Sequence, residues 1–327
     1  MKQESKKMTT PIADFVKKYA ASNMARLHMP GHKGQSFLGC ESWDITEISG
    51  ADSFYEADGI IAESEANATR VFGSQCTLFS TEGSSQCIRA MLYLAMLNGQ
   101  SGSNTNKRPT IAAARNVHKA FIYAATLLDY DVIWLWPEEM VSSICSCTIS
   151  PKQVEETLDE HQEIIAVYLT SPDYLGAQAD IRGIADVCHQ KNVILAVDNA
   201  HGAYLKFLEP SQHPLDMGAD ICCDSAHKTL PVLTGGAYLH ISKHAPMIFV
   251  EQAKHAMELF GSTSPSYLTM MSLDLCNRYL TEQYSERLKE MIELRCNCCK
   301  ELEILGWRVV ESDPLKITIE IPNGISS

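Results

Sequence analysis

Residues 193–202 read Val-Ile-Leu-Ala-Val-Asp-Asn-Ala-His-Gly, and this stretch indicates the fold. An apolar run rich in β-branched residues, bounded by polar ones, predicts a buried strand that ends in the carboxylate of Asp198. From about Thr77 onward, similar short runs alternate with amphipathic helical stretches. This alternation predicts an α/β fold, in which a mixed, mostly parallel sheet is sandwiched by helices.

The same criteria predict the remaining elements along the chain. The expected strands cover residues 77–81, 110–114, 131–136, 164–170, 193–197, 220–223 and 237–241. The expected helices cover 84–97, 119–128, 151–161, 182–191, 245–260, 265–280 and 282–305. Ser150, Pro151 and Gln153 form a capping signature at the third of these helices. The polar stretch 100–108 is expected to be a surface loop.

This pattern divides the chain into four segments. Residues 1–76 form an N-terminal arm and helical segment, and 77–260 form the α/β major domain. Residues 261–305 are connecting helices, and 306–327 are the start of an incomplete small α/β domain. That last segment holds two strand-like runs, 307–311 and 317–321, which are too few for an independently stable domain.

Composition excludes several classes of function. Lys and Arg number 27 against 40 Asp and Glu, so the net charge of -13 argues against nucleic acid or an anionic membrane as partner. No apolar run approaches the roughly 20 residues that span a bilayer. The N-terminal Met-Lys-Gln-Glu-Ser-Lys-Lys has no apolar signal region, so we expect a cytoplasmic protein. The 12 cysteines lack zinc-site spacing, and we expect buried thiols and no metal.

Polar residues directly after strands are the candidates for a site, because ligands of open α/β sheets bind at the carboxyl ends of the strands. Gly83, Ser84 and Ser85 stand at a strand-to-helix turn, where backbone N–H groups and hydroxyls can hold a phosphate. An ordinary N-cap would read the same way.

Three further junctions carry ionisable groups. Asp198 ends a strand and is followed by His201, Lys228 follows a strand in Ser225-Ala-His227-Lys, and His118 follows the strand at 110–114. Each has a plain structural reading: a helix-capping carboxylate, a solvated lysine and a hydrogen-bonded loop histidine. Together they fit pyridoxal phosphate (PLP) chemistry, which needs an imine-forming lysine, a carboxylate at the pyridine nitrogen and a phosphate cradle.

Five ordered motifs carry a family resemblance. One is the 193–202 stretch. The others are His-Met-Pro-Gly-His-Lys-Gly at 28–34, Asp-Ile-Thr-Glu at 44–47 with Asp52 and Gly59, Ser-Ala-His-Lys-Thr-Leu-Pro at 225–231 and Ser-Thr-Ser-Pro-Ser-Tyr at 262–267. The chain resembles the ornithine/lysine/arginine decarboxylases, PLP enzymes of the aspartate-aminotransferase fold, over nearly its whole length.

The resemblance implies a role for each candidate residue. Lys228 would form the imine, Asp198 would hold the pyridinium proton and His118 would stack on the cofactor ring. His201 would lie near the phenolic oxygen or the substrate carboxylate, and Ser84, Ser85, Ser225 and His227 would surround the phosphate. Ser262 would reach the phosphate of a neighbouring subunit, which implies at least a homodimer.

Two residues depart from the family pattern, as does the end of the chain. Asp173 stands where a neutral hydroxyl residue is usual, and either selects a basic side chain or lies at the surface, which we favour. Gly235 stands where glutamine is common. Family members continue past residue 327, so we expect this chain to bind PLP better than it turns over substrate.

The resulting hypothesis is PLP-dependent decarboxylation of lysine, arginine or ornithine to a polyamine-type amine, with Lys228 or His227 returning the proton. The sequence does not decide among the three amino acids. Transamination or β-elimination on the same fold is the alternative among enzymes, and an arginine that clamps the substrate α-carboxylate would distinguish it. A remnant that keeps the fold without turnover is the alternative outside catalysis.

Overall fold

The computed structural model describes residues 7–100, 108–137, 145–310 and 313–320. The strands are β1 (Cys76–Ser80), β2 (Thr110–Ala114), β3 (Asp131–Leu135), β4 (Ile164–Thr170), β5 (Ile194–Asp198), β6 (Ile221–Asp224), β7 (Ala237–Ile241), β8 (Arg308–Val310) and β9 (Thr318–Glu320). The helices are α1 (Pro11–Ala20), α2 (Ile60–Phe72), α3 (Ser84–Gln100), α4 (Lys119–Leu128), α5 (Pro151–Glu160), α6 (Ile181–Gln190), η1 (Ala203–Phe207), α7 (Pro214–Met217), α8 (Ala226–Thr229), α9 (Met247–Leu259), α10 (Tyr267–Glu282) and α11 (Tyr284–Ile304).

A seven-stranded sheet lies at the centre of the molecule, in the order β1-β7-β6-β5-β4-β2-β3. The strands β6, β5, β4, β2 and β3 pair in parallel, whereas β7 is antiparallel to both β1 and β6. The carboxyl ends of β2, β4, β5 and β6 therefore meet at one edge of the sheet. The predicted class, a mixed and mostly parallel sheet sandwiched by helices, is confirmed.

Two helical layers cover the sheet. Alternate side chains of the strands pack on α3, α4 and α9 on one face, and the others pack on α5 and α6 or on α2 and α10. The helix α3 is buried along most of its length because it carries apolar residues around nearly its whole circumference. Its first turn lies at the carboxyl edge of the sheet, where the candidate phosphate cradle is expected.

The predicted elements agree closely with the observed ones. All described strand ends fall within one residue of prediction and helix ends within two, except that α3 continues to Gln100. The capping box at α5 is present, with Gln153 N–H donating to Ser150 Oγ at 3.3 Å and Ser150 N–H to Gln153 Oε1 at 3.0 Å. Most of the predicted 100–108 loop lies outside the described residues.

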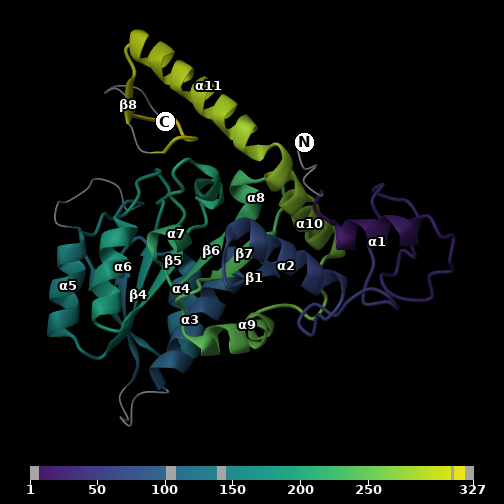
Figure 1. The fold of residues 1–327 in the computed structure, drawn as a ribbon, viewed down its shortest axis with the longest axis horizontal. Helices are drawn as coiled ribbons and strands as arrows, with labels where there is room; N and C mark the ends of the chain where they lie inside the picture. Colours follow the sequence, from purple (N-terminus) through teal and green to yellow (C-terminus); the bar gives the residue numbers. More distant parts are fainter. Residues whose placement is uncertain (1–6, 101–107, 138–144, 311–312, 321–327) are drawn as a thin grey trace, which may run out of the picture.

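The C-terminal part leaves the sheet on a long helix. Figure 1 shows α11 running outward toward the hairpin of β8 and β9. This hairpin segment returns to the sheet, since Lys316 Nζ donates to the Asp173 carbonyl at 3.2 Å and Thr318 Oγ1 to the Leu175 carbonyl at 3.1 Å. None of the helices in the described parts of the chain is long and apolar enough to cross a membrane. The four predicted segment boundaries stay predictions.

Candidate active site at the carboxyl edge of the sheet

The predicted site residues converge at the carboxyl edge of the sheet. Asp198 is the last residue of β5, where it pairs with Thr170 on β4 and with Cys223 on β6. Lys228 lies in the short helix α8, directly after β6, and His118 is the N-cap of α4, directly after β2. The segments after β2, β5 and β6 therefore bring an imidazole, an acid and an amine to one edge of the sheet.

Asp198 is almost fully buried and is held by donors on both carboxylate oxygens. Ala200 N–H donates to Oδ1 at 3.1 Å, and Tyr168 OH donates to Oδ2 at 3.2 Å. The Cys223 thiol lies 3.8 Å from Oδ1. Burial raises the pKa of Asp198, and the Ala200 amide and the positive charges of Lys228 and His118 oppose this rise. The side chain is thus fixed in place, and a cation nearby favours its ionised form.

Lys228 contacts His201 through Nζ and Nε2 at 3.1 Å. Partial desolvation lowers the pKa of Lys228, and the nearby Lys316 lowers it further against the opposing effect of Asp198. Desolvation together with these two lysines lowers the pKa of His201 to about 4. His201 is therefore a neutral acceptor near neutral pH, and the Lys228 amine loses its proton more readily than a solvated lysine does.

His118 caps a helix as well as facing the site. Its Nδ1 accepts a hydrogen bond from Ala120 N–H at 3.2 Å, which fixes the ring at the start of α4. Partial desolvation lowers the pKa of His118, while Asp198 raises it. The side chain is exposed, so its ring can cover the face of a planar ligand. Stacking on a cofactor stays a prediction.

The predicted phosphate cradle is tied to the lysine loop through two glycines. Gly83 N–H donates to the Gly235 carbonyl at 2.7 Å, and the N–H of His227 donates to the Gly236 carbonyl at 3.1 Å. The His227 ring also contacts that carbonyl, through Nδ1 at 3.1 Å. Ser84 and Ser225 are buried beside these turns. Hydrogen bonds to Gly235 and Gly236 thus connect the first turn of α3 and the Ser225–Lys228 segment, and a helix N-terminus beside them can hold a phosphate.

Gly235, one departure from the family pattern, has a steric explanation. Its φ of 94° lies in the left-handed region, and a Cβ at this position would approach the Thr81 carbonyl oxygen to 2.6 Å. A residue with a side chain would push the two turns apart. Glycine therefore permits the close contact between the cradle and the lysine loop.

Asp173, the other departure, is buried, so the expectation of a surface position was wrong. Its Oδ1 accepts three backbone N–H bonds, from Leu175 at 2.9 Å, Gly176 at 2.8 Å and Ala177 at 2.9 Å. The carboxylate is thereby engaged in closing its own turn. This turn presents Tyr174, whose ring packs edge-on against His201 at a centroid distance of 5.6 Å.

Ser262 lies at the outer rim of the cradle, where its backbone N–H donates to the carboxylate of Glu82. Its hydroxyl accepts from Ser264 N–H at 3.1 Å. The side chain is exposed, and its contact with a neighbouring subunit stays a prediction.

Two residues of the site were not predicted from the sequence. Tyr168 lies inside an apolar run, and only the pairing of β4 with β5 shows that its hydroxyl reaches Asp198. Lys316 lies 49 residues past Tyr267, the end of the last predicted motif, and comes near His201 and Lys228 only through the return of the hairpin segment. The Pro-Leu-Lys turn at 314–316 was the one signal, and it is weak.

The residues present fit PLP. Buried polar atoms of Asn116, Thr170 and Thr229 have no hydrogen-bond partner, and all three residues follow or end strands at this edge. Buried polar groups are normally satisfied, so these atoms indicate a polar ligand. Such a ligand would meet an amine, a buried carboxylate, an imidazole face and a helix N-terminus.

Comparison with known families agrees with this arrangement. Residues 10–319 match the model of the family described as Orn/Lys/Arg decarboxylase, major domain. The chain belongs to the Orn/Lys/Arg decarboxylase family. The match covers both the α/β sheet and the connecting helices.

Two relatives to which the chain is similar come from bacteria. An arginine decarboxylase of Halalkalibacterium halodurans is 28% identical over 342 residues, which cover 98% of this chain and 67% of the relative. The uncharacterised protein YaaO of Bacillus subtilis is 29% identical over 340 residues, covering 98% of this chain and 68% of its own. The family model places the chain in the family, and identity to relatives at this level does not decide its substrate.

Solved structures share the fold. A lysine decarboxylase from Francisella novicida superimposes with a TM-score of 0.75 at 21% identity, and lysine decarboxylase A from Pseudomonas aeruginosa with 0.76 at 18%. These alignments cover 91% and 95% of this chain but 44% and 51% of the two structures. The chain thus spans about half the length of these Orn/Lys/Arg decarboxylase structures.

Proposed function

We propose that this protein binds PLP at the carboxyl edge of its sheet and decarboxylates a basic amino acid: lysine, arginine or ornithine. The observation that carries the proposal is the 3.1 Å contact between Lys228 Nζ and His201 Nε2 beside a buried Asp198. Membership of the Orn/Lys/Arg decarboxylase family supports the reaction class.

Lys228 is the residue that attaches the cofactor. Its lowered pKa increases the fraction of free amine, which is the nucleophile toward a carbonyl carbon. His201 accepts a hydrogen bond from the amine and so orients it without adding charge.

Asp198 is the residue that holds a proton on the cofactor's ring nitrogen. Its two oxygens are fixed by Ala200 and Tyr168, and the charge of an ionised carboxylate favours a protonated partner. When bound, PLP supplies a protonated ring that accepts the electron pair released as CO₂ leaves. Exact placement of Asp198 is therefore necessary for turnover.

The other predicted residues orient the reactants. His118 would cover one face of the ring, and Gly83, Ser84, Ser85, Ser225 and His227 would bind the phosphate. His227 Nδ1 faces the Gly236 carbonyl, so its proton is held by the backbone. Either Lys228 or Nε2 of His227 then returns a proton to the substrate carbon.

The functional unit is proposed to be at least a homodimer, with Ser262 contacting the phosphate of the neighbouring subunit. The N-terminal arm supports this, because Leu27 and Phe37 are 94% and 91% exposed, which is unusual for large apolar side chains of a monomer. Sedimentation at assay concentrations should give twice the chain mass or more, and a monomer would contradict the assembly.

The test of activity uses the purified protein with PLP and, separately, lysine, arginine and ornithine. One of the three should yield CO₂ and the matching amine, and the Lys228→Ala variant should yield neither. Amine absent with all three substrates, despite stoichiometric PLP binding, would contradict decarboxylation of a basic amino acid. Keto-acid formation instead would indicate transamination.

A further inference from the structure

A second polar cluster, fully buried, lies beneath the site and has no part in the function proposed above. Asp224 ends β6 and precedes Lys228 by four residues. Its Oδ2 lies 3.1 Å from both His213 Nε2 and His240 Nε2, and its Oδ1 accepts from Asn199 Nδ2 at 2.6 Å. All four residues are 0% exposed, so each of these bonds forms without competing water.

The hydrogen bonds decide what this cluster can do. Leu215 N–H donates to His213 Nδ1 at 3.4 Å, so the ring proton of a neutral His213 is on Nε2 and points at Asp224. His240 Nδ1 contacts Thr77 Oγ1 at 2.8 Å, which leaves its Nε2 as the group facing the carboxylate. Two histidines and one aspartate could together ligate a metal ion. A metal would need the lone pair of His213 Nε2, but this nitrogen carries the ring proton here.

Asp224 is therefore a carboxylate anion that accepts from three donors. Burial alone would raise the pKa of Asp224, but His213 and His240 hold it well below its usual range. Burial lowers the pKa of His240 in turn, so this ring stays a neutral donor. A buried carboxylate with charge-assisted hydrogen bonds is held rigidly, because no water is present in the interior to replace its partners.

This anion joins the two loops of the candidate active site. Asn199, its third donor, follows Asp198 directly, and its own carbonyl accepts from Gly202 N–H at 2.9 Å to close the turn that carries His201. The Asn199 side chain also packs against Gly202 so closely that any side chain there would collide with it. On its other side, Asp224 continues into Ser225 and α8, which carries Lys228.

We propose that Asp224, with His213 and His240, is a positioning unit that fixes the Asn199–Gly202 turn relative to the Lys228 helix. It does not touch the cofactor space; it acts through Asn199 and through the chain. The part of this inference that concerns PLP affinity rests on the proposed function, whereas the part that concerns the two loops does not.

The test compares two buried carboxylates. Asp274 is the matched control: it is 0% exposed and accepts from Ser64 Oγ at 2.6 Å and from Ala13 N–H at 2.9 Å, but it joins α10 to α1 and α2, away from the loops. Asp224→Asn places an amide donor against imidazole donors. Asp274→Asn changes a cluster that contacts neither the Asn199–Gly202 turn nor the Lys228 helix.

Hydrogen exchange of the cofactor-free protein gives the first readout. Asp224→Asn should speed exchange of amides 199–205 and 225–230 by about tenfold, the effect expected of an unsatisfied buried polar group. Asp274→Asn should leave both segments at the rate of the parent protein. Parent-like exchange in Asp224→Asn, or equal acceleration in the control, would overturn the proposal.

PLP affinity gives the second readout, and a milder variant guards against misfolding. The PLP dissociation constant should rise about tenfold in Asp224→Asn and stay within about twofold in Asp274→Asn. If Asp224→Asn does not fold, His240→Phe removes one donor beside Phe72 and should speed exchange of the same two segments about threefold. A parent protein that binds no PLP would contradict the proposed function, and the exchange result would still decide the positioning role.

Discussion

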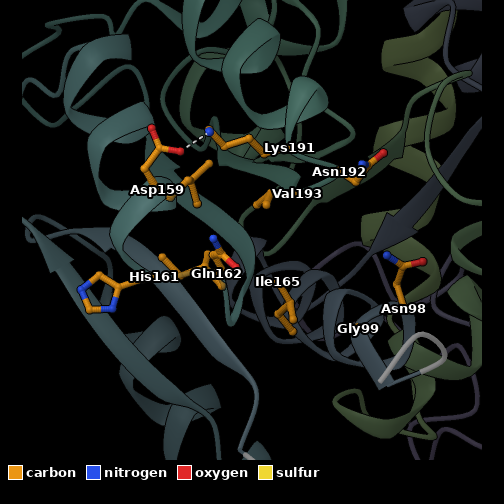
Figure 2. A pocket seen from close by; sticks show the side chains of 11 residues that line it. Asn98, Gly99, Asp159, His161, Gln162, Ile165, Lys191, Asn192 and Val193 are labelled. Carbon is orange, nitrogen blue, oxygen red and sulfur yellow. Dashed lines mark hydrogen bonds and ion pairs between the residues drawn. The ribbon is translucent and has the colours of Figure 1, made fainter. Parts of the chain in front are cut away.

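The two edges of the central sheet differ in kind. The amino edge contains a cavity of about 570 Å³, lined by residues from the ends of α3, α5 and α6. Figure 2 shows Lys191 there, turned toward Asp159, with which it forms an ion pair at 2.5 Å. At the carboxyl edge, no carboxylate in the described parts of the chain lies within ion-pair distance of Lys228, which instead contacts a neutral His201.

The difference shows that hollow space alone does not identify a site. At the amino edge, opposite charges neutralise one another in contact with solvent, and such pairs are mainly features of a surface. At the carboxyl edge, an amine with a lowered pKa and an acid with a raised pKa lie together with buried, unsatisfied polar atoms. Groups held away from their ordinary protonation behaviour are typical of functional sites.

The largest expected effect comes from removing the charge of Asp198. Asp198→Asn keeps the shape of the side chain but cannot favour a protonated ring nitrogen, so decarboxylation should fall by on the order of a hundredfold or more. PLP should still bind covalently to Lys228. The matched change at the amino edge, Asp159→Asn, should leave the rate within about twofold. Comparable losses in both variants would remove the distinction between the edges.

A smaller effect is expected from the hydroxyl that orients Asp198. Tyr168→Phe removes the donor to Oδ2 and should lower turnover about tenfold, because the carboxylate loses one fixed partner. Tyr130→Phe is the control, since Tyr130 donates to the Phe121 carbonyl at 3.0 Å in the same core cluster without contacting Asp198. Both should lose about 1 kcal/mol of stability. Equal turnover in the two variants would mean that Tyr168 only stabilises the core.

The pH dependence of stability should also differ between the edges. Because desolvation lowers the pKa of His201 from 6.5 to about 4, the unfolded chain binds more protons between these values. Stability should therefore fall as the pH drops from 6.5 toward 4, by about 1 kcal/mol after allowance for solvent screening. His201→Gln should flatten this slope, and His161→Gln at the amino edge should not. Urea unfolding at several pH values measures it, and parallel slopes in all three proteins would be the contrary result.

The smallest effect is expected from the amino-edge cavity itself. Lys191→Ala breaks the pair with Asp159 and should cost less than about 1 kcal/mol, as is usual for exposed ion pairs. PLP affinity and turnover should equal those of the parent protein. A change in either by fivefold or more would mean that this cavity affects PLP binding or catalysis at the site.

Much of the fold could be predicted from the sequence because the pattern is simple. Buried parallel strands read as apolar runs, and β5 begins and ends within one residue of its run at 193–197. The helix α2 was not delimited within the predicted arm because its buried face carries Ser64, Glu65 and Asn67, which break the apolar periodicity. With only four residues each, α7 and α8 are too short to show any period.

Only those residues of the candidate site that follow or end a strand could be predicted from the sequence. Lys228, Asp198 and His118 stand at such ends, whereas Tyr168 of the site and His240 of the buried cluster beneath it lie inside strands. Their roles depend on which strands are neighbours, and a sequence alone does not give that order. Asp173 was misjudged for a related reason, since three backbone amides can bury a carboxylate without any charged partner.

Reductive labelling tests the assignment of Lys228 as the amine that binds PLP. The protein is incubated with PLP, reduced with borohydride, digested and mapped by mass spectrometry. We expect a single pyridoxyl group on Lys228 and none on Lys191, the lysine of the amino-edge cavity. A label on another lysine, or no label at stoichiometric PLP, would contradict it.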